Sequence, residues 1–74
     1  MKKNKNNALT FGLFVDAQKV ANYLISNRMP FYFSATRAET PGYNIIFTWD
    51  SDLGWAENFC ATHSITHQMC YIEQ

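Results

Sequence analysis

The stretch that decides the fold is Tyr43-Asn44-Ile45-Ile46-Phe47-Thr48-Trp49. Apart from Asn44, its residues are β-branched or aromatic, and the turn-forming pair Pro41-Gly42 stands directly before it. The acidic cluster Asp50-Ser51-Asp52 follows the stretch and ends it. This composition and these boundaries are typical of a strand that lies buried in the middle of a sheet. Because side chains alternate along a strand, one face is expected to carry Tyr43, Ile45, Phe47 and Trp49.

Three further segments show the alternation that predicts strands. The first covers residues 8–15, and its inner face is expected to carry Leu9, Phe11, Leu13 and Val15. The second covers residues 31–38, and the turn Glu39-Thr40-Pro41-Gly42 joins it to the central stretch as a hairpin. Gly42 suits the third position of a type II turn, because that position needs a positive φ. The last strand is expected over residues 65–72, and its alternation leaves open which face is buried.

Two segments with helical spacing separate these strands. Asp16 is expected to be the N-cap of a helix that runs to Arg28, because its carboxylate can accept from the free amides of the first turn. Met29-Pro30 ends this helix, since the residue before a proline disfavours helical geometry. The acidic cluster after the central stretch opens a second helix, with its carboxylates near the positive N-terminal end. Gly54 costs about 1 kcal/mol relative to alanine inside a helix, so a start at Trp55 is the alternative.

The predicted order is strand, helix, strand, strand, helix, strand. With both helices on one face, this order forms an α+β fold with a four-stranded antiparallel sheet of the split βαβ, ferredoxin-like type. Right-handed crossovers place the first and third strands in the centre. Residues 1–7 are expected to be a flexible basic and polar tail, and residues 8–74 a single domain. The residues expected to be buried together are Leu9, Phe11, Leu13, Val20, Leu24, Phe33, Ile45, Phe47 and Phe59.

The charge balance excludes a broad electrostatic attraction to nucleic acid or to a membrane. The six basic and six acidic residues cancel, and no stretch approaches the ~20 apolar residues that span a bilayer. The two cysteines do not make a disulfide framework, and they fit reduced thiols in a cytoplasmic protein. A chain of 74 residues with 16% aromatic residues is too small to bury every ring, which favours an interface.

Four zinc-competent side chains lie close together in the pattern Cys60-x2-His63-x3-His67-x2-Cys70. Zinc sites of this ligand type usually place a spacer of about a dozen residues or more between the two pairs. The spacer here is far shorter. Cys60 is better explained as a small core residue, and the histidines as polar residues beside a turn. We therefore expect no metal and no cofactor.

Two further polar groups have a structural explanation as well as a chemical one. The acidic residues that open the second helix, together with Glu57, fit helix capping better than Mg²⁺ binding or acid–base catalysis. Arg37, Glu39 and Tyr43 meet around the hairpin turn. They form either a small-ligand site or a salt-bridged hairpin end, and we prefer the second interpretation.

The sheet face away from the helices is the strongest candidate for a binding site. It is expected to carry Phe14, Tyr32, Ile46 and Thr48. RNA-binding domains of this topology stack bases on aromatic residues of the central strands, but Ile46 and Thr48 stand where a ring is needed. A partly apolar, uncharged face suits a protein partner or a second copy of the chain. Scattered exposed apolar residues, which are normal on protein surfaces, are the alternative explanation.

No motif in the chain specifies an activity, so two classes of function remain. The first, which we favour, is a small non-catalytic protein-interaction module that regulates or inhibits a larger assembly, of the kind that phages and mobile elements encode. Its partner is then a host protein or a component of the assembly. The alternative is an oligomeric domain that binds a small ligand or cleaves a metabolite between subunits, and it rests on fold analogy alone.

Overall fold

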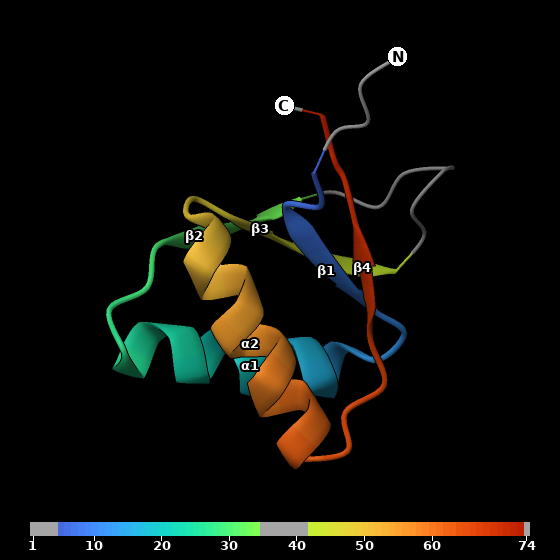
Figure 1. Cartoon of the computed structure of the whole chain (residues 1–74). Coiled ribbons are helices and arrows are strands. Elements are labelled where there is room, and N and C mark those ends of the chain that lie inside the picture. The colour runs from blue at the N-terminus through green and yellow to red at the C-terminus, as the bar shows by residue number, and fades with distance from the viewer. Residues whose placement is uncertain (1–4, 35–41, 74) are drawn as a thin grey trace.

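The computed structural model describes residues 5–34 and 42–73. Its elements alternate in the order that the sequence predicts, with two helices and four strands. They are β1 (Ala8–Phe11), α1 (Phe14–Ser26), β2 (Phe31–Ser34), β3 (Tyr43–Phe47), α2 (Asp50–Thr62) and β4 (Gln68–Cys70). Figure 1 shows both helices on the same side of the sheet.

The sheet has the strand order β2-β3-β1-β4, and every neighbouring pair is antiparallel. This order, with the βαββαβ succession, is that of the ferredoxin-like fold. The central positions of β1 and β3 are as predicted. Ile45 lies opposite Leu9 on one side and Phe33 on the other, so β3 is paired along both edges.

The main core lies between the sheet and the helices. Side chains of β1 and β3 meet those of α1 and α2 there, with Tyr23, Met29, Phe31 and Phe59 packed against them while half-buried. Leu13 and Phe33 are exposed, so the prediction that they are buried is wrong. The buried residues of this cluster are Leu9, Phe11, Ala17, Val20, Ala21, Leu24, Ile45, Phe47, Leu53, Ala56, Cys60 and Ile65.

The junction between β1 and α1 differs most from the sequence prediction. The strand ends at Phe11, instead of continuing to residue 15, because Phe11 lies opposite Tyr43, the first residue of β3. Gly42, the residue before Tyr43, has a φ of +111° and lies outside β3. The helix begins at Phe14, with Leu13 and not Asp16 as its N-cap. Asp16 instead lies in the first turn, where its charge faces the positive end of the helix.

Both helices end in a Schellman motif that the sequence did not indicate. At the end of α1, Met29 N–H donates to the carbonyl of Leu24 (2.9 Å) and Arg28 adopts a left-handed φ of 57°. At the end of α2, Ile65 N–H donates to the carbonyl of Cys60 (2.8 Å) and Ser64 has a φ of 56°. Arg28 is therefore outside the helix that it was expected to close.

The second half of the chain follows the prediction more closely. The helix α2 begins at Asp50, so the acidic cluster opens it and the alternative start at Trp55 is wrong. Thr48 and Trp49 lie beyond the end of β3 and are exposed. Gly42 has the positive φ expected of it, whereas residues 35–41, and with them the rest of the predicted turn, lie outside the described residues.

A second, smaller cluster lies on the sheet face away from the helices. Ala8, Ile46 and Ile72 are buried in it, and Cys70 packs against them half-buried. The side-chain amide of Asn7 extends the β1–β4 pairing: its Nδ2 donates to the carbonyl of Ile72 (2.9 Å), and its Oδ1 accepts from the Ile72 N–H (2.8 Å). The strand β4 covers only Gln68–Cys70 of the predicted residues 65–72. Cys70 and Ile72 face this second cluster, whereas Ile65, which lies before the strand, is buried in the main core.

Candidate functional site

The four residues predicted to form a binding face do not form one surface. Tyr32 and Ile46 lie opposite each other on neighbouring strands, as expected. Tyr32 is exposed, but Ile46 retains only 2% of its surface because the cluster with Ala8 and Ile72 covers it. Thr48 is exposed beyond the strand end. The prediction that Ile46 is available on an open face is therefore wrong.

Phe14 is exposed as predicted, but on a different part of the molecule. It is the first residue of α1 and not a strand residue, so it does not lie on the sheet face. Its ring meets the ring of Tyr43 edge to face, with centroids 5.7 Å apart and planes at 66°. The contact forms because the chain turns into α1 beside the point where β3 begins.

Around this contact lies the longest run of consecutive exposed apolar side chains in the described part of the chain, residues 13–15, and together with Tyr43 it forms what we call the α1 entry surface. Its members are Leu13, Phe14, Val15 and Tyr43, with exposed fractions of 60%, 57%, 51% and 43%. Successive helical residues point about 100° apart, so three in a row cannot all face the core. The residues of α1 that do face the core are Ala17, Val20, Ala21 and Leu24.

The α1 entry surface combines apolar area with an arrangement that restrains its rings. No residue of the run 11–15 is charged, and Asp16 is the first charged residue after it. Because Phe14 and Tyr43 contact each other, each ring loses rotamer freedom before any partner arrives. Edge-to-face pairs of this kind contribute roughly 0.5–1.5 kcal/mol beyond the area that they bury.

Other aromatic side chains contact one another across the two helices. Tyr23 of α1 stacks on Phe59 of α2, with centroids 4.3 Å apart and planes at 20°. The His63 ring lies against the Phe59 ring as well, with centroids 4.3 Å apart and planes at 42°. His63 is exposed at the C-cap of α2.

The alternative ligand site at the hairpin turn is only partly visible. Arg37 and Glu39 lie outside the described residues. Tyr43, the third residue of that prediction, contributes its ring to the contact with Phe14.

The zinc-competent residues of the second half are spread over different environments. Both cysteines are free thiols. Burial raises the pKa of the Cys60 thiol to about 11, with smaller contributions from the negative charges of Asp16 and Glu57. Burial also raises the pKa of Cys70. Within residues 5–34 and 42–73, no group of three or more His, Cys, Asp or Glu side chains is arranged to hold a metal ion.

Comparisons of the chain with protein families, with characterised proteins and with solved structures found no match. Neither helix of the part described here has the length and apolar character needed to cross a membrane.

Leu13 and Val15 are members of the α1 entry surface that sequence reasoning assigned to the core. The signal that could have identified them is the unbroken apolar run Leu13-Phe14-Val15 directly before Asp16. Three successive apolar residues cannot all face the same side of a strand or of a helix, so at least one of them must lack a core position.

Proposed function

We propose that this protein is a small non-catalytic interaction module that regulates or inhibits a larger assembly by docking a protein partner on the α1 entry surface. The observation that carries this proposal is the exposure of four neighbouring apolar side chains at one end of α1. Aromatic side chains such as those of Phe14 and Tyr43 are enriched at protein interfaces, where a few residues carry most of the binding energy.

The chemistry of the surface favours a protein over other partners. Nucleic acid needs basic side chains to neutralise phosphates, and residues 11–15 contain none. The pre-positioned rings of Phe14 and Tyr43 suit a partner that offers an apolar pocket or groove. The proposed setting is the cytoplasm, where the free thiols of Cys60 and Cys70 remain reduced.

The substitution that tests the proposal best is Leu13→Asp. Leu13 is the N-cap of α1 and makes no side-chain capping hydrogen bond. Aspartate is among the best N-cap residues and is worth about 1 kcal/mol there, so the variant should be at least as stable as the wild type. It places a charge within the α1 entry surface. Phe14→Asp is the second variant, because acidic residues are also tolerated in the first helical turn.

Ile25→Lys is the matched control. Ile25 is as exposed as Leu13 and lies on the same helix, but at its other end, where a positive charge is favourable. Thermal unfolding should show that all three variants are folded. Partners of the wild-type protein are identified by crosslinking and mass spectrometry, and binding of the purified partner is then measured by calorimetry.

The entry-surface variants should bind the partner about thirtyfold more weakly, which corresponds to the loss of one anchor residue of about 2 kcal/mol. Ile25→Lys should bind like the wild type. If the partner is a second copy of the chain, light scattering will show a dimer that Leu13→Asp and Phe14→Asp dissociate. If both variants keep every partner and the same oligomeric state, the proposal is wrong.

A further inference from the structure

An open hollow with a mixed polar and apolar lining lies on another part of the molecule, between α2 and the segment that leads into β4. It has a volume of about 360 Å³ and is lined by Gly54, Glu57, Asn58, Ala61 and His67. A second hollow, of about 260 Å³, is lined by Thr10, Phe11, Gly12, Thr66, His67 and Gln68. His67 lines both hollows, so its ring stands at the boundary between them.

The position of the His67 ring is fixed by the backbone. Its Nδ1 lies 2.8 Å from the carbonyl oxygen of Ile65. Because a carbonyl can only accept, Nδ1 must carry the proton and donate it. In the neutral ring the lone pair is then on Nε2, which faces Oε2 of Glu57 at 3.7 Å. Histidines that bind metals typically have this arrangement, with the second nitrogen donating to a carbonyl or carboxylate.

The separation of Nε2 and Oε2 suits a shared ion better than a direct hydrogen bond. An N–H···O bond spans about 2.7–3.2 Å, and the observed 3.7 Å is longer. Two donors held at about 2.1 Å from one tetrahedral ion lie about 3.4 Å apart. The Glu57 side chain is 47% exposed and the His67 side chain 17%. A small rotation of the more exposed carboxylate is enough to close this difference.

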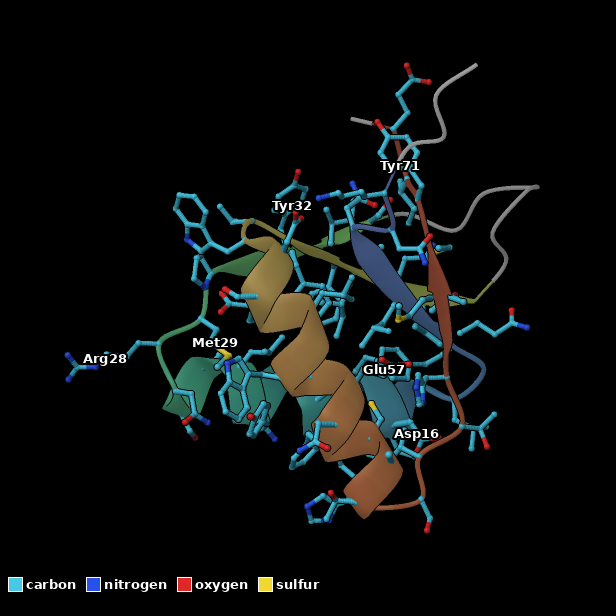
Figure 2. All side chains as sticks on the ribbon, viewed as in Figure 1. Asp16, Arg28, Met29, Tyr32, Glu57 and Tyr71 are labelled. Atoms are coloured by element: carbon cyan, nitrogen blue, oxygen red, sulfur yellow. The ribbon has the colours of Figure 1, made fainter. Side chains whose placement is uncertain are left out.

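The charge around the hollow is negative. Glu57 lines it, and Asp16 lies close enough for both carboxylates to raise the pKa of the same thiol, Cys60. Figure 2 shows Glu57 of α2 and Asp16 of α1 on the side of α2 that faces the segment leading to β4. Among the described residues, no lysine or arginine lines either hollow. A cation is therefore the ligand class that this environment favours.

We propose that Glu57 and His67 together bind a first-row divalent transition-metal ion such as Zn²⁺, with water completing its coordination. The imidazole nitrogen selects Zn²⁺, Ni²⁺ or Cu²⁺ over Mg²⁺ and Ca²⁺, which prefer oxygen ligands alone. The ion joins α2 to the segment before β4, far along the chain from the α1 entry surface. The core is complete without it, so the ion is not required for folding.

Titration of the purified protein with Zn²⁺ in competition with a chromogenic chelator measures the affinity of the Glu57–His67 site for Zn²⁺. His67→Gln and Glu57→Gln should each weaken binding at least tenfold, because each removes one of two protein ligands. His63→Gln and Cys70→Ser are the controls and should keep the wild-type affinity. Equal binding by all four variants, or a loss confined to the controls, would overturn the proposal.

A second measurement uses the unaltered protein and so does not depend on how the variants fold. In ¹⁵N NMR spectra of the histidine rings, Zn²⁺ should shift Nε2 of His67 while its Nδ1 stays protonated. The ring nitrogens of His63 should not change. A shift at His63 alone, or at neither histidine, would contradict the proposed site.

Discussion

Replacement of Gly42 by alanine should destabilise the protein strongly, because this position has no room for a side chain. Gly42 has a φ of +111°, a region that residues with a Cβ rarely adopt. A Cβ added there would lie 2.6 Å from the carbonyl oxygen of Phe11 and 3.3 Å from Oγ1 of Thr10. The first of these contacts is with backbone, so rotation of a side chain cannot relieve it.

The expected loss in the free energy of unfolding of Gly42→Ala follows from two costs. An unfavourable positive φ costs about 1–3 kcal/mol. To relieve the contact, β3 must shift away from β1 at the Phe11–Tyr43 pair, where the two central strands of the sheet meet. We therefore expect a loss of about 3 kcal/mol or more. At roughly 0.05–0.15 kcal/mol per residue, the whole domain has a stability of only about 4–11 kcal/mol.

Urea unfolding, followed by circular dichroism and tryptophan fluorescence, measures the loss, and the two other glycines are matched controls. At Gly12 and Gly54, no atom outside the glycine and its adjoining backbone lies within 4 Å of the position of an added Cβ. Gly12→Ala should change the free energy of unfolding by less than about 0.5 kcal/mol. Gly54→Ala should raise it by about 1 kcal/mol, because Gly54 lies exposed inside α2. That gain corresponds to roughly 4–8 °C in Tm for a domain of this size.

A Gly42→Ala protein within 0.5 kcal/mol of the wild type would refute the reasoning about the close approach of β3 to β1. A destabilised Gly54→Ala protein would instead refute the continuity of α2 through this residue. The two results are independent, because the sites lie in different elements.

Three further predictions concern stability. Ser64→Gly and Arg28→Gly should each raise the free energy of unfolding by about 0.5–1 kcal/mol, because each residue holds a left-handed conformation at a helix end; a loss in thermal unfolding would contradict this. The raised pKa of Cys60 means that the folded state holds its thiol proton more tightly than the unfolded state, so stability should fall from about pH 9 to about pH 11. Cys60 should account for about 2 kcal/mol of this fall. The free energy of unfolding of Cys60→Ala, plotted against pH, should not show this contribution. Asn7→Asp should cost about 1 kcal/mol, because the carbonyl of Ile72 loses its donor, whereas an unchanged urea midpoint would show that this bond is not needed.

The parts of the fold that could be predicted are those where local chemistry agrees with the tertiary structure. The β-branched and aromatic run before Asp50 forms the central strand β3, and the acidic residues behind it open α2. The element order and the central positions of β1 and β3 follow from these signals together with the handedness rule.

The junction after β1 could not be predicted because its residues are compatible with both a strand and a helix. Leu13 and Val15 continue the alternation of Leu9 and Phe11, and only Phe14 departs from it, so the local pattern favours a longer strand. What ends the strand is the position of its neighbour, since Phe11 already pairs with the first residue of β3. Register between strands is tertiary information, and it decides which side chains form the α1 entry surface.

The burial of Ile46 was missed for a related reason. The alternation of the last strand is equally consistent with either face being buried, so the sequence did not show that Ile72 covers Ile46. Helix ends were missed at Arg28 and Ser64 because neither is glycine, the residue that usually marks a Schellman motif.

The pairing of Asn7 with Ile72 determines how the fold responds to mechanical load. Asn7 and Ile72 form the outermost rung of the β1–β4 ladder, and the pairs Ala8–Cys70, Leu9–Met69 and Thr10–Gln68 follow it inward. A force that pulls residues 6 and 73 apart therefore strains one rung at a time, as in opening a zipper, and does not shear all of them together. The protein should yield at low force, with β4 detaching first and the paired strands β1, β3 and β2 remaining.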